Sequence, residues 1–447
     1  MRATPPGPTG EPVVGNSRRY ADDPFAFLQA CGAAYGDVVH FDLGPMETYM
    51  ITDPADVERV LVGEASRYAN PGFQDAALGE LLGDGLLLSE GESWREQRRR
   101  AAPSFDVRRL SGLAGRMVGA AEAALADWTP GEVRDVQVEM TEVTLEIICD
   151  AMLGIDLDDG RRETIRENLE PLGARFEPDP FRFLVPDWLP TREHRDYRRA
   201  LDALEGVIER IVAERRGTEG DPATDEGPMD LLSVLLRARG RGEQDDEAIR
   251  DEVMTILLAG HDTTSLALTY AWYLLSEHPG AERRVHDEVD RVVGDGTPTA
   301  ADVADLTVVE RALRESMRLY PPVYALFREP RMDVRLGGYR VPAGATVMLP
   351  QWVIHRSADH WTDPESFALD RWAPDRVAAR PRFAYFPFGG GPRSCIGRRL
   401  SMLEGKLILA TVASRYRLAY ARDGPLDLRG SLTMHPREPV EMRVVAR

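Results

Sequence analysis

One cysteine in this chain lies inside a glycine-rich loop, Phe388-Gly-Gly-Gly-Pro-Arg-Ser-Cys-Ile-Gly397. Glycine tolerates positive φ, so such a loop can turn tightly and let a flat ligand approach closely. Its free N–H groups can point at the Cys395 sulfur and stabilise the thiolate, and Arg393 adds a positive charge two residues earlier. A thiolate held in this way is a good ligand for a haem iron. The alternative is a buried structural thiol.

A second set of reactive residues interrupts the apolar stretch between positions 253 and 275, at Ala259-Gly-His-Asp-Thr-Thr264. Ala259 and Thr263 are four apart and share one helix face, and Gly260 leaves room for a small molecule. Asp262 and Thr263 could relay protons through water. The alternatives are a helix kink or a polar patch satisfied within the protein. His261 is expected to point elsewhere and has no assigned role.

Cationic and paired side chains form the remaining candidates. Glu315 and Arg318, three apart on a helix, can pair. Trp94 and Arg98 are spaced i, i+4 on another helix, and arginine suits the binding of carboxylates. Solvation at the surface is the competing explanation for any single arginine, because Lys406 is the only lysine among 55 basic residues.

The loop pattern of Phe388, Gly391, Arg393, Cys395 and Gly397 resembles the haem-binding loop of the cytochrome P450 family of haem-thiolate monooxygenases. Further matches upstream stand in the family's order, so the resemblance covers nearly the whole chain. It implies a cytochrome P450 fold, mainly α with a smaller β region and a long central helix over the haem. It also implies a single domain over residues 1–447, without a fused reductase, and haem b as cofactor.

The resemblance also implies roles for individual residues. Cys395 would be the axial ligand of the haem iron, and Thr263 and Asp262 would deliver protons during oxygen activation. Glu315 and Arg318 would lock structurally with Arg371, although Leu369 and Trp372 depart from the family's usual residues around it. The haem would be held by residues that match the family's contacts: Trp94, Arg98, Arg328, Arg393, Phe388, Gly391, Gly397, Ala259 and Gly260.

Residue patterns agree with a mainly helical chain. Helical periodicity predicts helices over residues 55–61, 94–101, 110–128, 138–153, 196–215, 249–277, 309–319 and 400–416. Strand-like segments lie at 38–43, 48–51, and from 339–341 through 346–349. A long irregular segment precedes Cys395, and such segments inside a compact fold usually carry function. The polar stretch 216–228 indicates a surface loop between helices.

Composition limits the classes of function. The net charge of −19 and the lack of a strongly basic domain argue against general nucleic-acid binding. Three cysteines give no disulfide framework and suit a reducing cytosol. Cys31 and Cys149 are expected to be inert core residues. With no secretory signal and no transmembrane anchor visible, the expected location is cytoplasmic.

Apolar segments predict the substrate class and the pocket. By resemblance, the pocket is lined by 73–88, 176–188, 254–258, 323–327 and 432–434, and an apolar pocket implies a fatty acid, terpenoid or carotenoid-like lipid. The apolar residues of 176–188 could form a membrane-touching entrance or pack in the core.

Electrons are expected from a separate protein, a ferredoxin with its reductase or a flavodoxin-type donor, because no flavin or nicotinamide fingerprint is present. A basic patch, Arg98-Arg99-Arg100 and Arg398-Arg399, would steer an acidic donor. Two other functions remain open: a peroxygenase using hydrogen peroxide, and a haem-based sensor or binder. Neither would need the pair Asp262 and Thr263.

Overall fold

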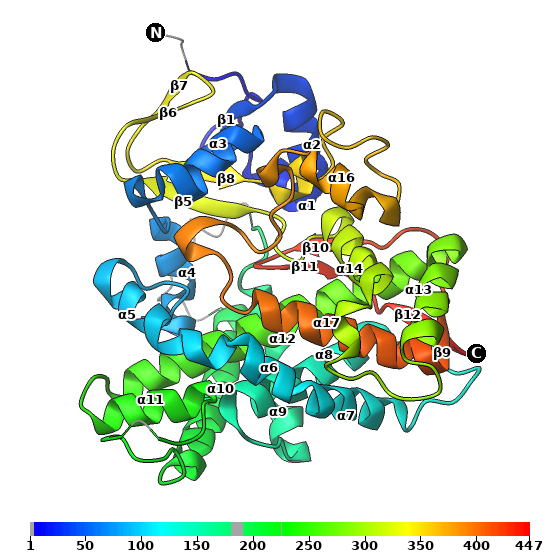
Figure 1. Cartoon of the computed structure of the whole chain (residues 1–447). Helices are drawn as coiled ribbons and strands as arrows, with labels where there is room; N and C mark the ends of the chain where they lie inside the picture. Colours follow the sequence, from blue (N-terminus) through cyan, green and yellow to red (C-terminus); the bar gives the residue numbers. More distant parts are fainter. Residues whose placement is uncertain (1–3, 180–190, 225) are drawn as a thin grey trace.

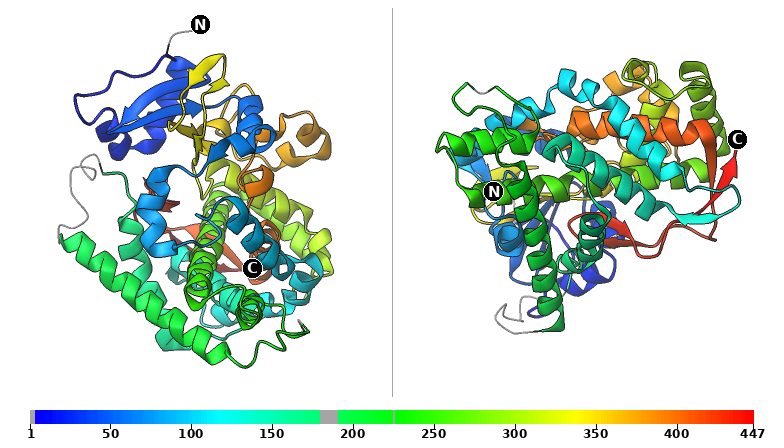
Figure 2. Two further views of the ribbon diagram at one scale, coloured as in Figure 1. Left: turned by 90° about the vertical axis from the view of Figure 1, so that its left-hand side faces the viewer. Right: turned by 90° about the horizontal axis from the view of Figure 1, so that it is seen from below.

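A large helical region and a smaller β-rich region form the molecule, described here from a computed structural model. The structure describes residues 4–179, 191–224 and 226–447. In Figure 1 the largest sheet lies at the top with α1 to α3, and most helices lie below it. Figure 2 shows the same two regions from two further sides. The prediction of a mainly α fold with a smaller β region is confirmed.

The α-helices follow the predicted pattern at the long periodic segments and add several that periodicity had not indicated. Among the described residues they are α1 Ser17–Asp22, α2 Pro24–Tyr35, α3 Pro54–Glu58, α4 Gly72–Leu82, α5 Gly91–Ala101, α6 Val107–Gly112, α7 Ala114–Leu125, α8 Val136–Ile148, α9 Asp159–Ala174, α10 Arg192–Arg215, α11 Leu231–Gly240, α12 Asp246–Glu277, α13 Pro279–Val292, α14 Thr307–Leu319, α15 Gln351–Ile354, α16 Pro374–Ala378 and α17 Arg398–Arg415.

Local capping sets several of these boundaries. The long helix α12 begins three residues before its apolar pattern because the Asp245 side chain accepts a hydrogen bond from the Ala248 N–H. The single helix predicted over 110–128 is divided at Leu113 into α6 and α7. Likewise, the helix predicted to reach 153 ends its regular part at Ile148 and continues as a π-turn, Cys149–Leu153. Apolar periodicity alone marks none of these breaks.

The strands form four small sheets. The largest has the order β1-β2-β8-β5-β3, from Val38–Leu43, Met46–Ile51, Thr346–Leu349, Leu326–Pro330 and Tyr68–Ala69. Of its pairings, only β2 with β8 is parallel. The segment predicted from 339 through 349 is divided between two sheets, because β7 pairs with β6 instead. The remaining strands are β4 Val133–Asp135, β6 Val334–Leu336, β7 Tyr339–Val341, β9 Tyr416–Tyr420, β10 Leu428–Gly430, β11 Met434–Pro436 and β12 Glu441–Ala446.

Two helices of the core position the candidate site. Helix α12 packs along α8 and also contacts α14 and α17. Between α15 and α17 the chain runs through short turns and α16, and this long irregular segment ends in the cysteine loop. The loop therefore leads directly into the buried helix α17 (Figure 1). In the described part of the chain, no helix is long and apolar enough to cross a membrane.

Candidate active site

Close packing against a neighbouring turn shapes the cysteine loop. The Cys395 N–H donates to the Phe388 carbonyl (2.9 Å), which closes the loop on itself. Gly391 has φ +67°, and a Cβ there would lie 1.9 Å from the Leu61 carbonyl oxygen. Only glycine fits such an approach at that φ. Gly397 differs, because its φ is −81° and a Cβ would meet only ordinary contacts.

The Cys395 sulfur has the environment of a ligand rather than of a core thiol. Its side chain is exposed, whereas Cys31 and Cys149 are buried. The pKa of Cys395 is raised, because burial outweighs the N–H groups of Gly397 and Arg398 and the charge of Arg98, which lower it. For Cys149, burial raises the pKa to about 12. Of the three cysteines, Cys395 alone combines exposure with N–H donors and cations.

A short window opens in the otherwise buried helix α12, where one residue is exposed and four are half-buried. From Asp251 to Leu275 every residue is buried except five: Leu258, Ala259, Gly260, Asp262 and Thr263. The Thr264 hydroxyl donates to Ser401 Oγ (3.0 Å) on α17, six residues after Cys395. This bond places the α12 window next to α17, the helix that follows the cysteine loop. The structure thus brings both predicted reactive sets to one place.

In and beside the window, the side chains of Thr263 and His261 bond to backbone carbonyls of α12. The Thr263 hydroxyl donates to the Ala259 carbonyl (3.1 Å). A Cβ on Gly260 would lie 2.6 Å from Ile148 of α8, so this glycine permits helix contact rather than opening space for a ligand. His261 is buried and its Nδ1 bonds to the Leu257 carbonyl (2.6 Å), which keeps it out of the window as expected.

The Asp262 carboxylate is held by two residues that sequence reasoning missed. Thr433 Oγ1 donates to Asp262 Oδ2 (2.8 Å), and His435 Nε2 lies 3.5 Å from the same oxygen. Although burial alone would raise it, the pKa of Asp262 is lowered to about 2 by His435, His261 and the Thr433 hydroxyl. Positions 432–434 were predicted only as pocket lining. No local signal marks the hairpin β10–β11 that carries these residues.

Three arginines from separate elements converge beside the cysteine loop without carboxylate partners. Arg98 donates to the Ser394 carbonyl (2.8 Å), Arg328 to the Phe327 carbonyl (2.7 Å) and Arg393 to the Ser89 carbonyl. Among the described residues, none of the three forms an ion pair. Burial and the nearby Arg393 lower the pKa of Arg328 to about 10. The Trp94 ring lies under Arg393 (4.8 Å to the centroid) and close to Arg98 (5.7 Å). Such a cluster favours a bound anion.

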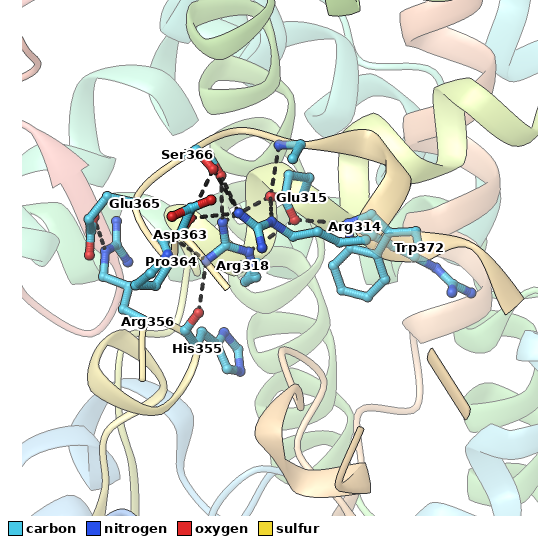
Figure 3. A network of polar contacts seen from close by, with 12 residues as sticks. Arg314, Glu315, Arg318, His355, Arg356, Asp363, Pro364, Glu365, Ser366 and Trp372 are labelled. Carbon is cyan, nitrogen blue, oxygen red and sulfur yellow. Dashed lines mark hydrogen bonds and ion pairs between the residues drawn. The ribbon is translucent and has the colours of Figure 1, made fainter. Parts of the chain in front are cut away.

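Glu315 lies at the centre of a buried polar network between α14 and the irregular segment (Figure 3). Arg318 bonds both of its oxygens (2.9 Å each), and Arg371 Nε bonds Oε1 (3.0 Å). The Trp372 indole N–H and the Ala368 N–H complete the set. The side chains of Glu315 and Arg318 are fully buried. The network fixes the chain that leads to the cysteine loop, and it takes no part in the open window.

The predicted pocket segments contribute unequally. Phe73 is partly exposed and meets Phe327 edge to face (5.3 Å), and Leu432 is exposed. In the segment 254–258 only Leu258 opens to the window, because residues 254–257 are buried. Phe176 packs edge to face on Tyr197 (6.4 Å), which is core packing. The rest of the proposed apolar entrance, including Phe181, Phe183, Leu184, Val185 and Trp188, lies outside the described residues.

The residues of this site fit a haem. An exposed thiol with N–H donors could ligate the iron, three unpaired arginines could bind its two carboxylates, and the α12 window could face the opposite side of the ring. Each element comes from a different part of the chain: α5, β5, the cysteine loop and α12. Comparisons with known proteins bear on the same point.

Residues 5–442 match the family Cytochrome P450. The chain is 36% identical to cyclooctatin synthase of Streptomyces melanosporofaciens, over 92% of this chain and 89% of that protein. It is 30% identical to pentalenene oxygenase of Streptomyces avermitilis, over 98% and 97%. The crystal structure of the cytochrome P450DA haem domain superposes with a TM-score of 0.88 at 28% identity, covering 100% of this chain and 98% of that one. The chain belongs to the cytochrome P450 family and is a haem-dependent P450 monooxygenase.

Proposed function

We propose that this protein inserts one oxygen atom from dioxygen into a terpenoid, and that the Cys395 sulfur would hold the iron of haem b. The observation that carries the proposal is the exposed Cys395 thiol, which faces N–H donors and cations next to the open window of α12. Bound haem would supply the redox-active iron, and an anionic sulfur ligand favours O–O cleavage. Phe388, Gly391 and Gly397 would shape the cysteine side of the haem site and Ala259 its α12 side, while Gly260 lets α12 pack closely against Ile148.

The arginine cluster would hold the haem carboxylates. Arg98, Arg328 and Arg393 come from three elements and lack carboxylate partners in the described structure, and Trp94 stacks beside two of them. Charge-assisted hydrogen bonds of this type are about twice as strong as neutral ones and orient a planar ligand. The cluster would therefore fix the ring in one orientation above Cys395.

The relatives favour a terpenoid over the other apolar substrates. Their names refer to cyclooctatin, cyclooctat-9-en-7-ol and pentalenene. The partly exposed apolar side chains Phe73, Leu258, Phe327 and Leu432 would contact a hydrocarbon of this kind.

A titration of the purified ferric protein tests the substrate class. Cyclic terpenes, fatty acids and carotenoid fragments are added while the Soret band is followed. We expect terpenes alone to shift the spin state from low to high. A shift only with fatty acids would overturn the terpenoid assignment and leave the monooxygenase assignment intact.

Replacing Thr263 by Ala should separate the consumption of reductant from the formation of product. The hydroxyl lies in the window beside Asp262, where it could pass protons to oxygen. We expect NADPH oxidation to continue while product per NADPH falls about 10-fold or more, since positioned acid–base groups contribute about 10²–10⁴-fold. Product and hydrogen peroxide are measured together. Thr269→Ala is the control, because its hydroxyl makes the same i−4 bond but is buried.

A basic groove beside the cysteine loop is the proposed docking site for the electron donor. The groove has a volume of about 690 Å³, and its lining includes Arg380, Arg382, Arg398 and Arg399. Arg314 and Lys406 also line it, but each forms an ion pair with Glu310 of the same lining. On a protein of net charge −19, a local basic region steers an acidic partner. The predicted patch is modified in two respects. Arg98 turns inward to Ser394, and Arg100 donates to Gln244 and pairs with Glu243, so that of these three only Arg99 is exposed.

The exposed charge of Arg399 can be reversed to test this docking site. We expect Arg399→Glu to slow reduction by a surrogate ferredoxin about 10-fold at low salt, with the difference shrinking as salt rises, because exposed charges are screened. Stopped-flow reduction measures it. Arg335→Glu on β6, also exposed, makes the same change of charge far from the groove and should leave the rate unchanged. Equal rates for both variants would rule out this docking site.

Turnover with a ferredoxin and its reductase, compared with turnover on hydrogen peroxide alone, separates the monooxygenase from the peroxygenase and from a binder. We expect product only with the electron-transfer system. The presence of both Asp262 and Thr263 in the open window supports this expectation.

A further inference from the structure

A C-terminal hairpin reaches the acid of the proposed proton-delivery pair. Strands β10 and β11 are joined by a tight turn in which the Ser431 N–H donates to the Thr433 carbonyl (2.9 Å). From this turn the Thr433 side chain bonds to Asp262 on α12, 171 residues earlier in the chain. The contact links two elements that sequence separation keeps far apart.

The hydrogen bonds of this contact form a chain in which each donor points toward the Asp262 carboxylate. An ionised carboxylate only accepts, so Thr433 Oγ1 donates to Asp262 Oδ2 (2.8 Å). Thr433 Oγ1 then accepts from His435 Nε2 (2.8 Å), and His435 Nδ1 accepts from the Gln137 side-chain amide of α8 (3.2 Å). This order places the His435 proton on Nε2. All bonds end on a single carboxylate oxygen. In the part of the chain that the structure describes, Asp262 Oδ1 has no hydrogen-bond partner.

Separate contacts hold the hairpin in place. The Tyr270 hydroxyl of α12 donates to the Met434 carbonyl (2.5 Å), and the Met434 N–H donates to the Pro322 carbonyl (2.8 Å). Met434 itself is fully buried. Thr433 and His435 therefore project from a backbone that is fixed on both sides, and they can set the orientation of Asp262 instead of following it.

We propose that Thr433 and His435 are positioning residues for oxygen activation, which hold Asp262 by Oδ2 and leave Oδ1 as the oxygen that exchanges a proton with water beside Thr263. Without the clamp, the carboxylate could rotate out of the window. The inference rests on the proton-delivery role proposed above for Asp262 and Thr263, and it assigns a function to the hairpin that neither the family resemblance nor the window provides.

Paired substitutions at Thr433 test the clamp. Thr433→Val removes the hydroxyl at nearly constant shape, and Thr433→Ser keeps it. With the terpene that gives the largest spin shift, we expect Thr433→Val to lower product per NADPH about 10-fold, as loss of an orienting hydrogen bond to a functional group typically does, and Thr433→Ser to keep it near the wild-type value. His435→Ala should resemble Thr433→Val, and His435→Gln, which keeps an N–H donor, should resemble wild type.

A matched control separates positioning from general damage to the hairpin. Tyr270→Phe loosens the same hairpin at Met434 but leaves the Thr433–Asp262 bond intact. We expect its thermal midpoint to fall while coupling stays unchanged. If Tyr270→Phe uncouples as strongly as Thr433→Val, the hairpin acts only as a scaffold and the inference is overturned.

Asp262→Asn separates this inference from the proposed function. If Asp262→Asn leaves coupling unchanged, the proton-delivery role of Asp262 fails, and the clamp with it. If Asp262→Asn uncouples but Thr433→Val does not, the clamp alone fails. A readout without turnover comes from NMR of ¹⁵N-histidine-labelled ferrous carbonmonoxy protein. The network requires a proton on Nε2 of His435, whose signal is assigned by its loss in His435→Gln, and a ring protonated on Nδ1 alone would contradict it.

Discussion

Replacing Cys395 by alanine should abolish both the thiolate spectrum and catalysis. Cys395 is the cysteine that is exposed and receives N–H groups, from Gly397 and Arg398, and the loop around it is fixed by the Cys395 to Phe388 bond. Without the sulfur no anionic ligand remains in the loop to hold the iron or to favour O–O cleavage. We expect the spectrum of the reduced, carbon monoxide-bound protein to lose its thiolate band and product formation to fall below detection.

The two other cysteines provide matched controls for that experiment. Cys31 and Cys149 are buried core residues outside the cysteine loop, whereas Cys395 is exposed. Burial raises their pKa to about 11 and about 12. We expect Cys31→Ala and Cys149→Ala to keep the wild-type spectrum, with only the modest loss of stability that a shortened core side chain brings. A Cys395→Ala protein with the wild-type reduced spectrum would refute the assignment of the ligand.

Removing the charge of Glu315 should be the most destabilising change outside the site. Glu315→Gln leaves the buried guanidinium groups of Arg318 and Arg371 without their shared carboxylate. Breaking a buried ion pair in this way costs about 3–5 kcal/mol. We expect the free energy of unfolding to fall by that amount, and haem incorporation to fall with it, because the network fixes the chain before the cysteine loop.

A milder variant and a control keep this prediction testable if Glu315→Gln does not fold. Trp372→Phe removes one neutral donor to Glu315 (2.9 Å) and should cost about 1 kcal/mol. Glu310→Gln, on the same helix, breaks a partly exposed pair with Arg314 and a pair with the buried Lys406, which keeps its bond to the Val303 carbonyl. Because Glu310 itself is partly exposed, this variant should cost only about 1 kcal/mol. Denaturant unfolding of the holoproteins measures all three. Similar losses for Glu310→Gln and Glu315→Gln would contradict the central place of Glu315.

Helices were predicted accurately from the sequence where apolar residues repeat with helical periodicity. Helices at 192–215 and 307–319 were found within a few residues, because an amphipathic stripe repeats locally. The break at Leu113 and the π-turn after Ile148 were missed, since an apolar run looks the same through a break. The strands β9 to β12 were also missed. They are short, and their pairing partners lie far along the chain, such as β4 for β12.

Gly260 and Arg98 were both singled out from the sequence, but the function expected of each was incomplete. Gly260 was expected to leave room for a small molecule, but its missing side chain accommodates Ile148 of α8. Arg98 was placed both in the haem contacts and in a docking patch, and its bond to the Ser394 carbonyl turns it inward. Residue type and spacing identified both positions. Their neighbours, which come from distant segments, decided what each position does.

The sequence by itself determined the family, the thiolate candidate Cys395 and the pair Asp262 and Thr263, because each depends on residues close together in the chain. Only the tertiary structure decided that Thr433 and His435 hold Asp262, and that three arginines from separate elements meet beside the cysteine loop with no carboxylate partner among the described residues. The physical reason is the distance along the chain over which each effect acts. Periodicity and loop chemistry act over a few residues, whereas the electrostatic environment of a buried carboxylate or arginine is set by groups that folding brings from anywhere in the chain.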